Sequence, residues 1–195
     1  MEERSKEGLS TEERSILVVV EIPKGSRNKY EWDTTLQCFK LDRMLFSSVH
    51  YPSDYGFVRD THAEDGDPLD AMVIVGEATF TGCVIEAKPI GLFKMWDEKG
   101  LDHKVLCVPV SDPQWNWLDD ISDVPAHLLL EIEHFYAIYK DLEMKKTRVA
   151  GWQDAATAWK VIHESRAAFI ERGGSAAGSS GGSSSSNSVA FDPRD

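Results

Sequence analysis

Apolar runs rich in β-branched residues dominate the first two thirds of the chain. The runs Ile16–Ile22 and Val105–Val110 have the composition of buried strands. A Pro/Gly-shaped loop over 51–57 leads into another short strand. Further strands are predicted at 29–32, at 36–41 as its hairpin partner, at 71–75, and at 84–88 and 91–96, which Pro89 separates.

The hydrophobic spacing changes to a helical period after Asp123. Leu128, Leu129, Ile132, Phe135, Tyr136 and Tyr139 share one helical face, in a helix that begins near Pro125. A second helix is predicted from near Asp154 to Gly173-Gly174, a sequence that commonly ends a helix.

Six or seven short strands followed by two helices favour a mainly β fold with some α (α+β). Such strands close most simply into a small barrel with the helices packed on it. We expect the single folded domain to span 15–172. The charged, aperiodic segment 1–14 is predicted to be a flexible arm, and the Ser/Gly-rich segment 173–195 to be disordered.

Charge and composition narrow the classes of function. The net charge of −12 argues against nucleic acid as the main partner, because a phosphate backbone needs a basic surface. No apolar run approaches the roughly 20 residues of a membrane span, and 1–14 holds no apolar signal-peptide core. Three cysteines in apolar contexts are interpreted as reduced, buried thiols, so we expect a cytoplasmic protein.

The stretch Asp65-Gly66-Asp67-Pro68-Leu69-Asp70 places three carboxylates in a stiff turn before a buried strand. Like charges this close repel unless something neutralises them, and carboxylate oxygens suit hard cations such as Mg²⁺. The spacing does not fit an EF-hand, since no start position combines oxygen ligands at the alternating positions with Gly at the sixth and Glu at the twelfth.

Other charged residues gather at predicted strand ends and loops. The candidate site contains seven acids, four cations and three phenols: Glu21, Glu31, Asp65, Asp67, Asp70, Asp97, Asp102; Lys29, Arg43, Lys104, Lys140; Tyr51, Tyr55, Tyr139. If these side chains converge, their formal charge of −3 would attract several divalent cations, which in turn would bind a polyanion. Metals that clamp a phosphoryl oxygen and activate a water are the usual apparatus of phosphoryl hydrolysis.

Several motifs carry a resemblance to a known family. They are Glu21-Ile22-Pro23-Lys24-Gly25, Lys29-Tyr30-Glu31, Asp42-Arg43, Tyr51-Pro52 with Tyr55-Gly56, the acidic stretch 65–70, 97–104, and Tyr139-Lys140-Asp141-Leu142-Glu143. In this order and spacing the chain resembles the family I soluble inorganic pyrophosphatases over about 16–172. The bacterial form is the more similar, because the large extensions of the eukaryotic form are missing.

The resemblance implies an OB-like, closed five-stranded β-barrel with two C-terminal helices. It also implies Mg²⁺-dependent hydrolysis of pyrophosphate to two orthophosphates, with several Mg²⁺ per site, Mn²⁺ or Zn²⁺ as possible substitutes, and a homo-oligomer, a hexamer in the bacterial form.

The resemblance further assigns roles to individual residues. Asp65, Asp70, Asp97 and Asp102 would hold metal, with Glu21 and Glu31 in the metal or water shell. Asp67 would take the proton of the attacking water, and Asp97 is the alternative base. Tyr51 would orient the acidic turn. The phosphates would be bound by Lys29, Arg43, Tyr55, Lys104, Tyr139 and Lys140.

Two other functions compete with hydrolysis. A non-catalytic OB-type module for anionic ligands would carry a basic groove with aromatic platforms, whereas acids dominate this site. A structural metal-binding domain would explain the aspartates but gives no reason for Lys29, Arg43, Lys104 and Lys140.

Overall fold

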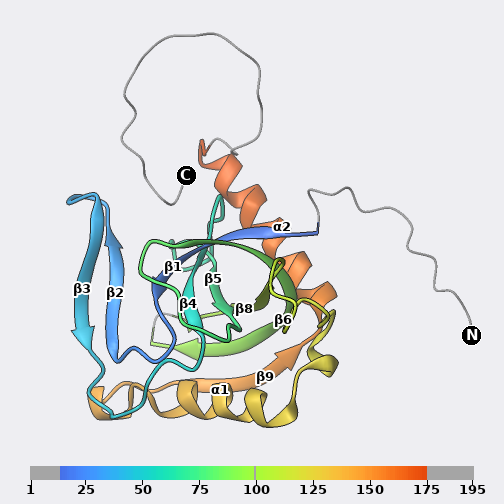
Figure 1. Cartoon of the computed structure of the whole chain (residues 1–195). Helices are drawn as coiled ribbons and strands as arrows, with labels where there is room; N and C mark the ends of the chain where they lie inside the picture. The colour runs from blue at the N-terminus through green and yellow to red at the C-terminus, as the bar shows by residue number, and fades with distance from the viewer. Residues whose placement is uncertain (1–13, 99, 175–195) are drawn as a thin grey trace, which may run out of the picture.

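The computed structural model describes residues 14–98 and 100–174, so the predicted arm and tail lie almost entirely outside the described residues. Within them, nine strands and two α-helices form the fold (Figure 1). The strands are β1 Ile16–Ile22, β2 Asn28–Asp33, β3 Cys38–Met44, β4 Asp54–Val58, β5 Asp70–Val73, β6 Val84–Asp97, β7 Gly100–Leu101, β8 Lys104–Pro109 and β9 Arg148–Gln153. The helices are α1 Ala126–Ile138 and α2 Ala155–Glu171.

Five of the strands close a ring. The pairs β1–β4, β4–β5, β8–β6 and β6–β1 are antiparallel, and β5–β8 is parallel. Closure leaves no open sheet edge in the ring, which removes the unpaired backbone groups that an edge would expose. The OB-like five-stranded barrel expected from the sequence is therefore confirmed.

The hairpin of β2 and β3 forms a separate two-stranded sheet that stands beside the barrel (Figure 1). The hairpin pairing was predicted, but β3 begins at Cys38 rather than Leu36 and continues to Met44. Cys38 is exposed and Cys83 is half-buried, so the expectation of three buried thiols was right only for Cys107. The cysteines of the described residues are free.

Strand β6 is one continuous strand of 14 residues, although the sequence predicted two strands separated by Pro89. The pairing of β6 with β8 shifts register between Pro89 and Gly91. An irregularity of this kind accommodates the missing N–H of proline without ending the strand. Because β6 also pairs with β1 and β9, its length ties the barrel to the segment between the helices.

Strand β9 was not predicted. Its sequence, RVAGWQ, has neither an apolar run nor clear alternation, and its residues are only partly buried or exposed. It becomes a strand by pairing with the end of β6, with Phe93 opposite Trp152. Tertiary pairing of this kind overrides weak local preference.

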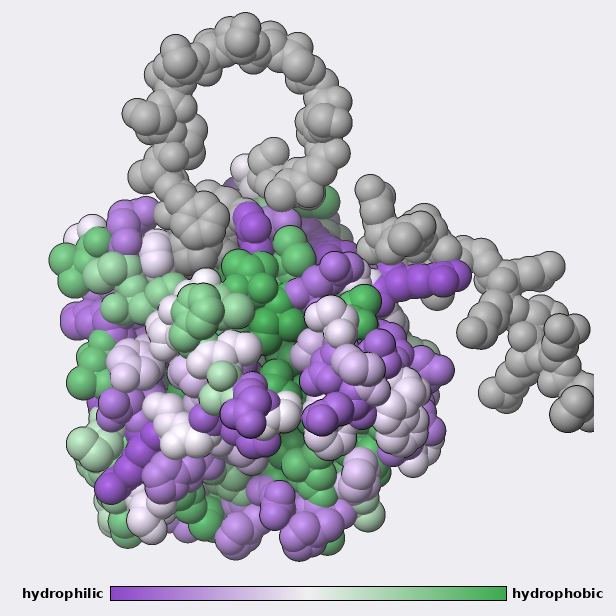
Figure 2. Space-filling model, in the orientation of Figure 1, coloured by the Kyte–Doolittle hydropathy of each residue, from purple (hydrophilic) through white to green (hydrophobic). Residues whose placement is uncertain are grey.

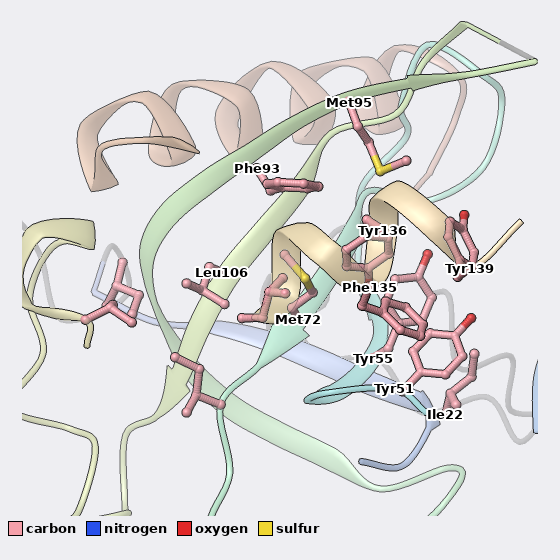
Figure 3. Close-up of a cluster of buried hydrophobic side chains, with 14 of the residues drawn as sticks. Ile22, Tyr51, Tyr55, Met72, Phe93, Met95, Leu106, Phe135, Tyr136 and Tyr139 are labelled. Atoms are coloured by element: carbon pink, nitrogen blue, oxygen red, sulfur yellow. The ribbon is translucent and has the colours of Figure 1, made fainter. Parts of the chain in front are cut away.

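Side chains of the barrel strands alternate between two apolar clusters. In β5, Met72 belongs to the cluster that α1 covers with Phe135 and Tyr136 (Figure 3). Its neighbour Val73 belongs to the second cluster, which includes Ile162 of α2. The two helices thus cover different sets of barrel side chains, as the period-2 alternation of strands requires. No helix of the described segments is long and apolar enough to cross a membrane.

Candidate active site

All fourteen residues proposed from the sequence line one cavity of about 550 Å³. They come from five barrel strands or their connections, from the β2–β3 hairpin and from the end of α1. The structure therefore brings together side chains that lie up to 119 positions apart, from Glu21 to Lys140. The cavity is strongly polar, with nine acidic and five basic side chains among its lining residues.

The parallel pairing of β5 with β8 sets Asp70 directly opposite Lys104. The Lys104 ammonium lies 2.6 Å from a carboxylate oxygen of Asp70 and 2.6 Å from one of Asp102. Asp102 lies two positions before Lys104, and their contact is local in the chain. Burial opposes the charge on Lys104, but the two carboxylates outweigh it and raise its pKa. Burial also raises the pKa of Asp102.

Four tyrosines gather at the end of the α1-facing cluster (Figure 3). The Tyr55 hydroxyl donates a hydrogen bond to Asp70, and its ring centroid lies 5.3 Å from the Lys104 ammonium. The Tyr51 ring lies 5.4 Å from that of Tyr55, so Tyr51 contacts the acidic segment through Tyr55. Burial raises the pKa of Tyr51 and Tyr55, which keeps both phenols protonated and able to donate.

A β-bulge in β1 carries Glu21 to the cavity. Val20 pairs with Gly56 and Ile22 with Tyr55, which leaves Glu21 as the extra residue. A Cβ at position 56 would overlap the carbonyl oxygen of Val19, so only glycine fits there. The Glu21 carboxylate accepts the backbone N–H of Trp32 at 3.0 Å. Burial, with the nearby charge of Asp70 adding to it, raises the pKa of Glu21 to about 8.

The hairpin contributes a second group of charges. Lys29 of β2 pairs across the hairpin with Arg43 of β3, and Asp42 occupies the irregularity in their register. The Lys29 ammonium forms ion pairs with Glu31 and, at 3.8 Å, with Asp42. The Arg43 guanidinium contacts both Asp42 and Glu143, and these partners raise its pKa against the opposing effect of burial.

Lys140 follows α1 and lies 2.8 Å from Asp97, at the end of β6. Glu98 is 3.4 Å from the same ammonium and 3.0 Å from that of Lys145. Burial opposes the charge of Lys140, but Tyr139, Asp97 and Glu98 outweigh it, so its pKa is raised. The Lys140 side chain is only 10% exposed, although a lysine is usually solvated.

The acidic turn has the geometry that Asp-Gly predicts. The Asp65 carboxylate accepts the backbone N–H of Asp67 at 3.1 Å, and Gly66 adopts a positive φ of 97°. Both aspartates are exposed, while Asp70 turns into the barrel as the first residue of β5. The turn therefore presents Asp65 and Asp67 at the mouth of the cavity and Asp70 inside it.

Seven other residues also line the cavity: Trp32, Asp42, Phe57, Pro68, Glu98, Tyr136 and Lys145. Sequence reasoning assigned none of them a role. Asp42 and Glu98 adjoin predicted site residues, and that adjacency was the available signal. Tyr136 lies on the apolar face of α1, where a tyrosine is usually part of the core, and it does belong to the core cluster as well.

The donors available for a cation are carboxylate oxygens, which suit hard cations. Among the described residues, no three His, Cys, Asp or Glu side chains come together as a metal-holding group. Lysines stand between the carboxylates instead, with Lys104 between Asp70 and Asp102. The carboxylates of Asp70 and Asp102 thus converge on an ammonium, and the fit of this cavity to a metal rests on the chemistry of its carboxylate donors.

The family model described as inorganic pyrophosphatase matches residues 18–170. An inorganic pyrophosphatase of Methanosarcina mazei is 54% identical over 162 residues, covering 83% of this chain and 96% of the relative. One from Synechocystis is 50% identical over 149 residues, covering 76% of this chain and 88% of the relative.

Solved structures agree with the sequence comparisons. The inorganic pyrophosphatase of Thermus thermophilus superposes with a TM-score of 0.80 at 40% identity, covering 85% of this chain and 97% of that one. The enzyme of Helicobacter pylori gives a TM-score of 0.79 at 38% identity, covering 85% and 99%.

Proposed function

Because the chain belongs to the inorganic pyrophosphatase family, we propose that it hydrolyses pyrophosphate to two orthophosphates. The observation that supports this most strongly is the convergence of fourteen residues of suitable chemistry in one cavity. In the reaction, the oxygen of a water bonds to one phosphorus, the bridging P–O bond breaks, and the second phosphate leaves with the bond's electron pair.

The family is metal-dependent, and the carboxylate donors of this cavity favour Mg²⁺, with Mn²⁺ or Zn²⁺ as substitutes. The cations would be held by Asp65, Asp70, Asp97 and Asp102. Glu21 and Glu31 would bind them directly or through a water molecule. When bound, the cations would neutralise phosphate oxygens and lower the pKa of the attacking water.

The acidic turn supplies the base. Asp67 lies at the exposed mouth of the cavity, where its carboxylate can accept the proton of the attacking water. Asp97 is the alternative base, but its ion pair with Lys140 favours a role in binding instead.

The basic and phenolic side chains bind and orient the two phosphates. Lys29 and Arg43 approach from the hairpin, Lys104 and Tyr55 from the barrel, and Tyr139 and Lys140 from the end of α1. Ammonium, guanidinium and phenol groups all donate hydrogen bonds to phosphate oxygens. Tyr51 supports this arrangement through its ring contact with Tyr55, which holds Asp70.

The non-catalytic OB-type module is not favoured. A module that binds anionic polymers presents a basic groove, whereas acids outnumber bases in this cavity by nine to five. Without bound cations such a cavity would repel a polyanion. The excess of acids therefore favours a metal-dependent site, in which cations neutralise the carboxylates.

A substrate panel tests the proposal. Phosphate release is measured from pyrophosphate, tripolyphosphate and ATP, each with Mg²⁺, Mn²⁺ or Zn²⁺. We expect rapid release from pyrophosphate with Mg²⁺ and little from ATP. Equal rates on all three substrates would contradict a site built for two phosphates.

The oligomeric state, the domain bounds and the cellular location are further proposals, which rest on the family and on the molecular surface. Hydrophobic residues form separate patches among polar ones on the face shown in Figure 2. Exposed side chains such as Phe80 and Trp117 offer area for contacts between subunits, which supports a homo-oligomer, a hexamer by analogy with the bacterial form. A domain of 15–172 and a cytoplasmic location, consistent with the free cysteines, remain predictions.

A further inference from the structure

Glu143 is a buried carboxylate that the roles above do not use. It ends the short 3₁₀ helix Asp141–Glu143 after α1. Its neighbours Leu142 and Met144 are 64% and 91% exposed, whereas the Glu143 side chain is only 5% exposed. A carboxylate is buried in this way only when a cation pairs with it, so the partner of Glu143 is informative.

That partner is Arg43, a hundred positions earlier in the chain. The Arg43 Nε donates to one carboxylate oxygen of Glu143 at 2.9 Å, and Nη2 lies 2.9 Å from the other. This side-on, bidentate contact matches the planar fork of a guanidinium to a carboxylate and fixes the orientation of the guanidinium plane.

The contact leaves a defined set of donors for a ligand. A guanidinium carries five N–H groups. Within 14–98 and 100–174, two of them serve Glu143 and one, on Nη1, serves Asp42. The two others are available to an acceptor in the cavity, which Arg43 lines and Glu143 does not.

The same contact joins two parts of the fold. The β2–β3 hairpin carries Lys29, Glu31 and Arg43, but it is a two-stranded sheet outside the barrel. An isolated hairpin is marginally stable, so its placement depends on contacts with the rest of the molecule. One is the Trp32 N–H on Glu21, and Arg43–Glu143 is another, at the opposite end of the hairpin strand pair.

We propose that Glu143 is a positioning residue, which holds the Arg43 guanidinium and the end of the hairpin in the orientation that receives a phosphate oxygen of pyrophosphate. This inference rests on the proposed function, because it names the part of the site that orients the substrate. Glu143 acts through Arg43 and does not touch the substrate itself.

The test compares Glu143→Gln with Asp141→Asn, which removes one acid from the same turn but leaves the Arg43 contact intact. Binding of imidodiphosphate, a pyrophosphate analogue with a P–N–P bridge, is measured by calorimetry with Mg²⁺. We expect roughly tenfold weaker binding for Glu143→Gln and a raised KM, the size of one misaligned charge-assisted hydrogen bond. Asp141→Asn should bind as the unmodified protein does.

A second arm separates positioning from a general loss of structure. In an Arg43→Lys background, Glu143→Gln should change binding less than twofold, because lysine cannot form the bidentate contact. Glu143→Asp, which keeps the charge but shortens the reach, should give an intermediate loss and serves if the Gln variant folds poorly. Unchanged binding in Glu143→Gln, or an equal loss in both backgrounds, would overturn the proposal.

The result of the Glu143 binding test does not depend on whether the protein hydrolyses pyrophosphate. Should the unmodified protein bind imidodiphosphate yet release no phosphate from pyrophosphate, hydrolysis would be refuted. The comparison of the Glu143 and Asp141 variants would still decide whether Glu143 orients the phosphate-binding arginine.

Discussion

The Lys104 ammonium lies between the carboxylates of Asp70 and Asp102, at 2.6 Å from each. Lys104 is almost fully buried, and Asp70 faces it because β5 and β8 run parallel at this point. The barrel thus folds around a charge cluster in which one cation faces two acids. The excess negative charge remains for a ligand or metal to neutralise.

Replacing Lys104 with Met should destabilise the protein most when a chelator is present. Removal of one partner of a buried ion pair leaves an uncompensated charge and costs about 3–5 kcal/mol. Divalent cations would replace the lost charge, so Mg²⁺ should restore part of the stability. Urea unfolding with EDTA and with Mg²⁺ measures both effects. An equal loss in the two conditions would contradict a shared metal position at Asp70 and Asp102.

The Asp67→Asn variant should bind metal as the unmodified protein does but hydrolyse pyrophosphate more slowly, because it lacks the general base. The change preserves the shape of the turn and removes proton acceptance, which contributes about 10²–10⁴-fold to rates of this kind. Steady-state rates and Mg²⁺ titrations of Asp67→Asn and Asp97→Asn check the assignment. A wild-type rate for Asp67→Asn would transfer the role of base to Asp97.

The stability of the protein in EDTA should fall as pH rises from about 5 to about 8 because of Glu21. Its pKa is raised from 4.5 to about 8 on folding, so in this window the folded state holds a proton that the unfolded state has lost. Stability then declines with pH by at most about 1.4 kcal/mol per pH unit from this group. Glu21→Gln should flatten the curve, as urea titrations at several pH values would show. A slope that persists unchanged in the variant would assign the effect to other groups.

Gly56→Ala should damage both the fold and the site. The added methyl group meets the Val19 carbonyl, a backbone atom that cannot move aside without disturbing β1. We expect a loss of about 2–3 kcal/mol and a displaced Glu21 bulge. Thermal unfolding and the Mg²⁺ affinity of the variant test this, with Gly76→Ala as a control, because a methyl group there meets only the end of the Gln114 side chain. Wild-type stability of Gly56→Ala would contradict the close approach of Gly56 to the Val19 carbonyl.

The local sequence pattern predicted the elements that bury a whole strand or a whole helical face. Strand β8 is buried at every position and α1 has a clear apolar face, and both were found close to their actual bounds. Strand β9 and the continuity of β6 through Pro89 depend on pairing between distant segments, which no local pattern records.

The site shows the same division. Clustered carboxylates and lysines such as Asp70 and Lys104 stand out in a sequence because charge is rarely placed next to core strands. The contribution of Tyr136 and Glu143 could not be predicted, since one resembles a core aromatic and the other a surface acid. Only the folded chain shows that Glu143 lies on Arg43.

Metal-dependent hydrolysis at this cavity is tested most directly by measuring phosphate release from pyrophosphate. The purified protein and its Asp67→Asn variant are compared, each with Mg²⁺ and with a chelator. We expect fast release with Mg²⁺, none with the chelator, and at least a hundredfold slower release by the variant. Absence of release with Mg²⁺, or release that neither the chelator nor Asp67→Asn diminishes, would contradict a metal-dependent site at the mouth of this barrel.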